Sequence, residues 1–151
     1  MDFIILKGDS EMAPKAAATP ARGKASNLFK AAKSFCSFSV NDLQKAKQFY
    51  GETLGLDVSE TPEGLELDTG NNTVFLYPKP NHTPASFTVL NFQVNDIEEA
   101  VDELAALGVT LEHYNLPDIK TDDRGICRGP GPQIAWFKDP AGNILSVLEE
   151  Q

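Results

Sequence analysis

The stretch VNDLQKAKQFYGETLGL at residues 40–56 returns in altered form as VNDIEEAVDELAALGV at residues 94–109. Each copy runs from the end of a hydrophobic segment through Asn-Asp into an amphipathic stretch that stops at Leu-Gly, and the copies begin 54 residues apart. An internal repeat on this scale predicts that one supersecondary unit occurs twice. The sequence therefore predicts two similar halves, with any binding site between them.

The first half reads as a strand, a helix and three further strands. Segment 34–40, SFCSFSV, alternates in the way that is typical of a half-buried strand. Asp42 supplies an N-cap for a helix that Gly55 ends. Strand-like segments follow at 56–60, 64–69 and 72–78, separated by Gly- and Asn-rich turns.

The second half repeats this order. Residues 86–94 form the predicted first strand, and Asp96 with Glu99 has capping-box spacing at the start of a helix that Gly108 ends. Further strands are expected at 109–114, 133–139 and 144–150. Residues 115–131 are expected to form a long loop, and loops of that length are often lids or binding loops.

The remaining residues divide the 151-residue chain into an extension and one domain. Residues 1–34 carry a net charge of +3 and read as a flexible extension, with a short helix through Leu28, Phe29 and Ala32 that Ser26 caps. Residues 35–151 carry −12 and form the expected folded domain, with modules at 35–80 and 86–151.

The composition also excludes several kinds of partner. An acidic domain argues against binding to nucleic acid or to anionic membranes, because phosphates require clustered basic residues. No apolar run approaches the length of a membrane span. Cys36 and Cys127 lie 91 residues apart without a Cys-x-x-Cys motif, which favours a reducing compartment and hence the cytoplasm. The negative charge favours a cationic partner or serves only solubility.

The repeat, the helix endings FYGETLGL and LAALGV, and the C-terminal WFKDPAGNILSVLEE together resemble the vicinal oxygen chelate superfamily. That group includes glyoxalase I, extradiol dioxygenases, fosfomycin-resistance transferases and bleomycin-resistance proteins, and the resemblance covers roughly residues 35–150. It implies an α+β fold in which two βαβββ modules form a curved, mostly antiparallel sheet around a central cup. It also implies a homodimer.

The resemblance implies a place for a metal, which can be compared with this chain. Metal-dependent members hold four ligands in the cup, and the corresponding positions here carry Phe35, Val89, Ser146 and a residue near Leu76. Such sites use imidazole and carboxylate groups. None of these four residues is of that kind, so neither a divalent metal nor another cofactor is expected.

The same positions predict a ligand-binding cup. Ser37, Ser39, Asn91 and Gln93 share strand faces with Phe35 and Val89, Trp136 could stack on a ligand, and Arg128 could clamp a carboxylate. The predicted ligand-binding residues are Phe35, Ser37, Ser39, Leu76, Val89, Asn91, Gln93, Arg128, Trp136 and Ser146. The apolar members could equally well fill the cup as core.

Three functions follow from this pattern. The first is a metal-free protein that binds or sequesters a small organic or cationic compound, as bleomycin-resistance proteins do. The second is a glyoxalase-like lyase, isomerase or transferase, for which His113 is the candidate general base. The third is an interaction module with a filled cup.

Overall fold

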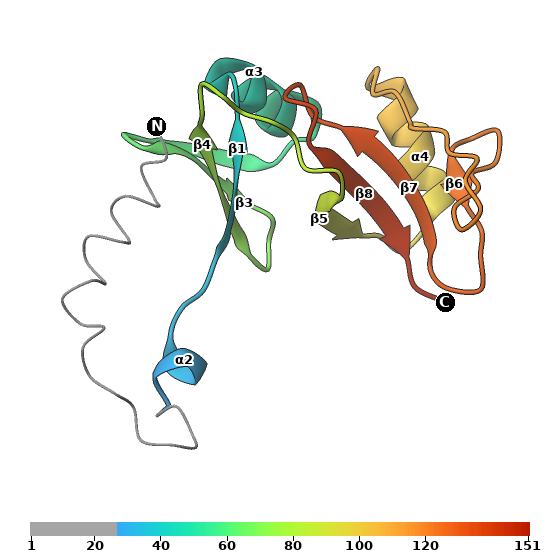
Figure 1. The fold of residues 1–151 in the computed structure, drawn as a ribbon, viewed down its shortest axis with the longest axis horizontal. Helices are drawn as coiled ribbons and strands as arrows, with labels where there is room; N and C mark the ends of the chain where they lie inside the picture. Colours follow the sequence, from blue (N-terminus) through green and yellow to red (C-terminus); the bar gives the residue numbers. More distant parts are fainter. Residues whose placement is uncertain (1–26) are drawn as a thin grey trace.

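The computed structural model describes residues 27–151, and the expected cap at Ser26 lies outside this range. The described chain forms two modules in sequence (Figure 1). Before the first module lies α2 (Leu28–Ala31), a single turn that buries none of its residues. In the part of the chain that the structure describes, no helix is long and apolar enough to cross a membrane.

The first module has the predicted βαβββ order. It contains β1 (Cys36–Val40), α3 (Leu43–Lys47), the π-helical turn η2 (Gln48–Thr53), β2 (Asp57–Thr61), β3 (Gly64–Asp68) and β4 (Thr73–Pro78). The sheet order is β1-β4-β3-β2, and β1 runs parallel to β4. The side chain of Asp42 accepts from the amides of Gln44 and Lys45, as predicted for the N-cap.

The second module repeats this plan with β5 (Thr88–Gln93), α4 (Ile97–Ala106), β6 (Ile126–Cys127), β7 (Gln133–Lys138) and β8 (Ile144–Glu149). The order is β5-β8-β7-β6, with β5 parallel to β8. Asp96 caps α4 by accepting from the amide of Glu99. Gly55 and Gly108 end the two helices with φ of 74° and 81°, a conformation that glycine adopts without strain.

Two predicted boundaries in the second module were wrong. Residues 109–114 form no full strand: Leu111 makes one isolated bridge to Phe137, and the amide of Glu112 donates to the carbonyl of Trp136. Ile126 and Cys127, which were expected in a loop, pair with β7 as β6. The reason is that strand pairing depends on a partner at the sheet edge, which local composition does not reveal.

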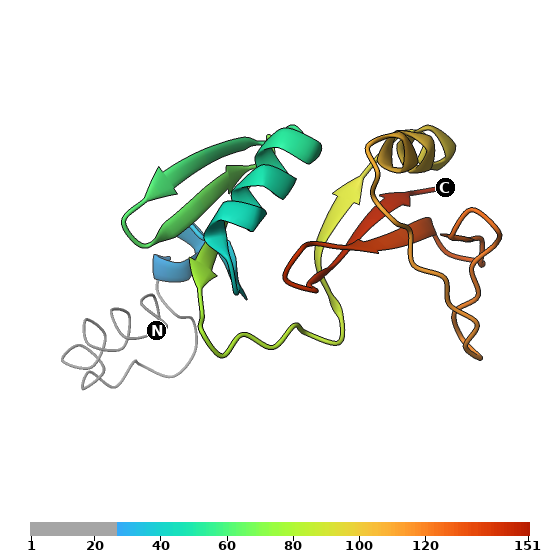
Figure 2. The same cartoon turned by 90° about the horizontal axis from the view of Figure 1, so that it is seen from above.

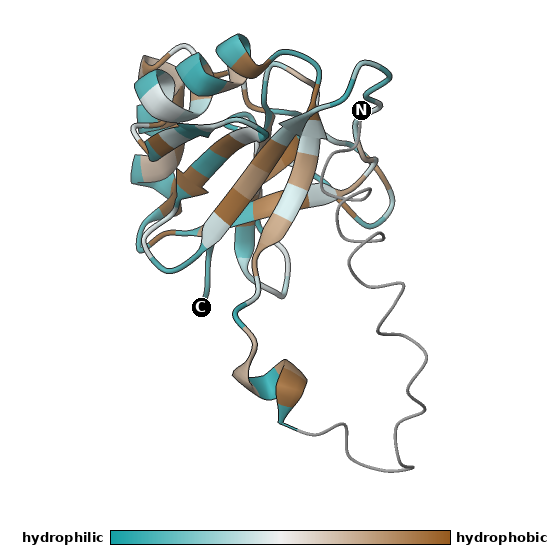
Figure 3. Cartoon of the chain, turned by 90° about the vertical axis from the view of Figure 1, so that its left-hand side faces the viewer, coloured by the Kyte–Doolittle hydropathy of each residue, from teal (hydrophilic) through white to brown (hydrophobic). Residues whose placement is uncertain are grey.

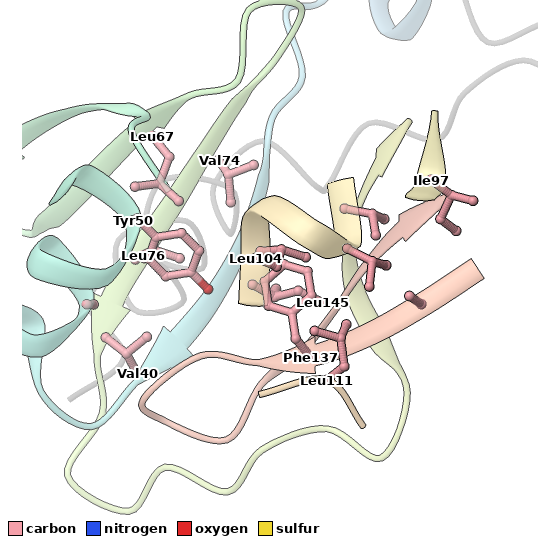
Figure 4. Packing of buried hydrophobic residues seen from close by; sticks show 14 of the residues in the cluster. Val40, Tyr50, Leu67, Val74, Leu76, Ile97, Leu104, Leu111, Phe137 and Leu145 are labelled. Carbon is pink, nitrogen blue, oxygen red and sulfur yellow. The ribbon is translucent and has the colours of Figure 1, made fainter. Parts of the chain in front are cut away.

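The two modules share no strand pairing, and residues of both contribute to one hydrophobic core. Figure 2 shows α3 and α4 on one side of the molecule and the linker between the modules on the other. The core is one cluster that includes Tyr50, Leu67 and Leu76 from the first module and Leu104 and Phe137 from the second (Figure 4). Phe49 links the halves, because its ring lies 6.4 Å from that of Phe137.

Alternation along the strands gives each sheet two different faces. On the first sheet, Leu65, Leu67, Val74 and Leu76 face the helix, whereas Glu66 and Phe75 pair with each other on the opposite side. Brown and paler residues alternate along these strands in Figure 3. We call the side of each sheet that faces away from its helix the open face.

Gly64 is required by a close approach between β3 and β4. A methyl group added at Gly64 would lie 2.0 Å from the carbonyl oxygen of Leu76, which is far inside van der Waals contact. We therefore expect Gly64→Ala to lower the free energy of unfolding by about 2 kcal/mol or more, as overpacking does. Urea unfolding measures this, with Gly131→Ala as the control because nothing lies within 4 Å of a methyl group there. Equal stabilities of the two variants would contradict the assignment.

Candidate functional site

A buried hydrogen-bond network joins the two modules. The hydroxyl of Tyr50 donates to Asp139 Oδ2 over 2.7 Å, and both residues are buried. Asp139 also accepts from the amides of Ala141 and Asn143 and from the side-chain amide of Asn143. A buried carboxylate is tolerated when its oxygens are satisfied in this way. We call Tyr50, Asp139 and Asn143 the junction.

The junction extends to the first strand and the linker. Asn143 Nδ2 donates to the carbonyl of Ser39 over 2.9 Å. The ring of His82 lies between modules, with Nδ1 2.7 Å from Ser39 Oγ and Nε2 3.1 Å from the carbonyl of Ala141. Because a carbonyl only accepts, Nε2 carries the proton in this arrangement. The linker therefore contacts both modules through the ring of His82.

Burial, then the charge of Asp139 and then its hydrogen bond raise the pKa of Tyr50 far above its usual 10.0. Tyr50 is therefore a donor throughout the physiological pH range. A group whose pKa is raised by folding stabilises the fold below its unfolded pKa and loses that contribution as the pH rises above it.

Because folding raises the pKa of Tyr50, the effect of Tyr50→Phe on stability should depend on pH. At pH 7 the variant should lose about 1.5–3 kcal/mol of unfolding free energy, because a hydrogen bond to a charged group is removed. Above pH 10 the difference from the unsubstituted protein should shrink by about 1.4 kcal/mol per pH unit, because unfolded Tyr50 ionises there. Urea unfolding from pH 7 to 11 measures both, with Tyr77→Phe as control. A difference that is constant with pH would contradict the buried-donor role.

The open face of the second sheet brings together several predicted site residues. Asn91, Ser146 and Trp136 lie side by side on β5, β8 and β7. Ser146 is fully buried and lies 2.6 Å from Asn91 Oδ1, to which its hydroxyl donates. Gln93 shares the next row with Leu148 and Ile134. The structure thus brings these residues together on one face of the second sheet.

Trp136 forms an aromatic corner on that face. Its indole Nε1 donates to Thr88 Oγ1 over 3.1 Å, and its ring meets Tyr114 edge to face with centroids 5.5 Å apart. A groove of about 410 Å³ begins here, lined by Ser86, Phe87, Thr88, Tyr114, Leu116, Ile119, Trp136 and Ile144. That volume falls within the usual range for small-molecule sites.

The groove is walled on one side by a hairpin from the long loop, residues 114–121, which we call the tongue. The amide of Thr121 donates to the carbonyl of Tyr114, Asn115 pairs with Lys120, and the backbones of Leu116 and Ile119 bond to each other. Ion pairs hold the following segment to α4: Arg124 contacts Glu98 and Asp102, and Arg128 contacts Glu98. The sequence indicated a binding loop here but not its internal pairing.

Three predicted site residues do not lie on the open faces. Leu76 is in the helix-side core, because its parallel partner Phe38 faces that side. Val89 sits at a β-bulge and packs against the core, so that Thr88 takes the open-face position. Arg128 bonds to Asp122, Gln133 and Glu98, so its guanidinium is occupied by protein groups.

The other predicted residues lie on or near the first sheet. Ser37 and Ser39 alternate with Phe38 on β1, and Phe35 just before it is 56% exposed. The hydroxyl of Ser39 is hydrogen-bonded to the ring of His82. His113, the candidate base, is exposed and lies outside the groove.

The positions that the family resemblance assigns to metal ligands do not fit a divalent ion. Only Ser146 among them carries an oxygen, and that hydroxyl donates to Asn91. Phe35 and Val89 carry no ligand atom, and Leu76 faces the helix side. Within residues 27–151, no group of three or more His, Cys, Asp or Glu side chains could hold a metal ion.

The family model for the Glyoxalase/Bleomycin resistance protein/Dioxygenase superfamily matches residues 34–147, and the chain belongs to that superfamily. A curated relative, the uncharacterised protein YraH of Bacillus subtilis (strain 168), is 25% identical over an alignment of 126 residues, and the match covers 73% of this chain and 91% of that protein.

Solved structures agree with this membership. The antibiotic-binding protein TnmS3 from Streptomyces sp. CB03234 is 25% identical, with a TM-score of 0.57 over 80% of this chain and 98% of that one. The fosfomycin resistance protein FosX from Listeria monocytogenes is 14% identical, with a TM-score of 0.60 over 80% and 94% of the two chains. At that identity FosX supports the fold alone.

Proposed function

We propose that this protein binds and sequesters a small organic molecule in the groove beside Trp136. The observation that carries the proposal is the groove itself, where three aromatic side chains, Phe87, Tyr114 and Trp136, meet around a volume of about 410 Å³. Phe87 is 67% exposed, so its ring is accessible to a ligand. The likeness to TnmS3, an antibiotic-binding protein, supports the binding of a small organic molecule.

The chemistry of the groove favours binding over catalysis. Its lining supplies aromatic rings, hydroxyl groups and aliphatic side chains. A catalytic site commonly pairs a nucleophile or acid with a base within hydrogen-bonding distance. Glu112 and Lys138 form an ion pair at 3.0 Å, and neither they nor His113 line the groove.

The proposal includes metal-independent binding. The residues at the family's ligand positions offer an aromatic ring, aliphatic groups and one engaged hydroxyl, so a ligand would be held by the protein directly. Chelation should then leave the affinity for an organic ligand unchanged.

Trp136 is the only tryptophan of the chain, so its fluorescence tests the site directly. Titration with a panel of aromatic compounds should give saturable quenching, with the same Kd in the presence of EDTA. Phe87→Ala should weaken binding at least fivefold, because it removes one wall of the groove. Phe29→Ala is the matched control, since Phe29 is 75% exposed on α2 and outside the groove. The absence of saturation across the panel, or a Kd that rises in EDTA, would count against the proposal.

We further propose that the working form is a homodimer, in which a second copy covers part of the open faces. Phe35 and Phe87 expose 56% and 67% of their surfaces on different modules, and the two sheets are not joined within one chain. Large exposed apolar side chains are characteristic of interfaces.

Sedimentation equilibrium should therefore give about twice the 16.4 kDa chain mass. Phe35→Glu should shift the protein toward monomer, because it places a charge in an apolar interface, whereas Phe29→Glu should not. A monomeric unsubstituted protein at micromolar concentration would exclude the dimer.

A further inference from the structure

The groove beside Trp136 carries no charge. All eight side chains that line it are uncharged. Placing an ion against such a surface would cost solvation free energy without a compensating partner. The composition of the groove therefore favours a neutral ligand.

The acidic character of the domain lies elsewhere. Glu98 and Asp102 are paired with Arg124 and Arg128 at the base of the long loop. The carboxylate of Glu112, two residues before Tyr114 in the chain, forms an ion pair with Lys138 at 3.0 Å. None of these carboxylates lines the groove, and each is paired with a basic side chain, so no carboxylate there offers a direct partner to a cation.

Two hydroxyl groups that line the groove, those of Thr88 and Tyr114, can donate a hydrogen bond to a ligand. Thr88 Oγ1 accepts from the Trp136 indole, which leaves the hydroxyl hydrogen of Thr88 to donate. The hydroxyl of Tyr114 has no partner among residues 27–151, and burial, followed by the charge of Glu112, raises its pKa, so it is protonated at neutral pH. Two hydroxyl donors beside an aromatic corner suit a ligand oxygen.

The tongue closes this corner with aliphatic side chains. Leu116 and Ile119 both line the groove, and Leu116 is 53% exposed. Their backbones pair with each other, so the two side chains are presented on a hairpin of fixed shape. Together with the indole of Trp136 they form walls that suit a flat ring system.

We propose that the groove selects neutral, flat aromatic molecules that carry a hydrogen-bond-accepting oxygen, which the hydroxyls of Thr88 and Tyr114 bind. This inference rests on the proposed binding function and names the class of ligand.

Three tricyclic probes test it by equilibrium dialysis. Fluorenone and fluorene share a skeleton and differ in a carbonyl group, and N-methylacridinium carries a permanent positive charge. Fluorenone should bind at least threefold tighter than fluorene and at least tenfold tighter than N-methylacridinium. A hydrogen bond contributes about 1 kcal/mol, which corresponds to roughly a fivefold change in Kd.

Variants assign this preference to the two hydroxyls. Tyr114→Phe and Thr88→Val should each weaken fluorenone binding by about threefold to tenfold and leave fluorene within twofold. Thr88→Ser keeps the hydroxyl and should retain affinity, which separates its role from that of strand stability. Tyr77→Phe and Thr73→Val, on the first sheet, are the matched controls.

The outcomes separate the two proposals. If fluorenone, fluorene and N-methylacridinium all fail to bind the unsubstituted protein, the proposed function fails and this inference with it. If the three bind with equal affinity, or the cation binds more tightly, the groove is a binding site but the inference is overturned. The same holds if both hydroxyl deletions leave the ratio of fluorenone to fluorene affinity unchanged.

Discussion

The hydrogen bond from Tyr50 to Asp139 is the constraint on which the arrangement of the two modules depends. It joins residues 89 positions apart, from the helical side of one module to the β7–β8 turn of the other. Asp139 accepts four hydrogen bonds in all, so the turn and the junction share one carboxylate. If one partner of this buried carboxylate were removed, a polar group would be left buried without a hydrogen bond. The free-energy cost of that is larger than the net contribution of the hydrogen bond to stability.

With the modules held in this way, the alternation of each strand determines where a ligand can bind. The helices and the junction take one side of each sheet and bury the aliphatic residues of β3, β4, β7 and β8 there. The other side is left with aromatic rings, amides and hydroxyls, and on the second sheet the tongue adds a wall. The groove thus exists because the apolar residues of the second sheet pack on its other face, which the helix covers. Binding pockets that combine apolar walls with a few polar groups are the common kind.

The sequence predicted the parts of this structure that depend on local pattern. The repeat, the caps at Asp42 and Asp96 and the stops at Gly55 and Gly108 are all confirmed, because they depend on neighbours in the chain. The expected open-face positions of Val89 and Leu76 differ from those in the structure, because a bulge shifts the alternation at Val89 and Leu76 pairs with Phe38 on the helix side. The roles of His82 and Tyr50 could not be read from the chain, because the partners Ser39 and Asp139 lie 43 and 89 residues away. Arg128 combines two near partners with Glu98, which lies 30 residues away. The ligand-binding role of the groove residues stays a prediction.

The most direct test of the account is the ¹⁵N-resolved NMR signal of the Trp136 indole, the only one of its kind in the chain. In this structure that N–H donates to Thr88 inside the groove. Saturation with fluorenone should shift this signal and those of the Thr88 and Leu116 amides, while the amides of α2 and β2 stay unchanged. If fluorenone binds and the indole signal does not move, the ligand site lies elsewhere and the central claim is wrong.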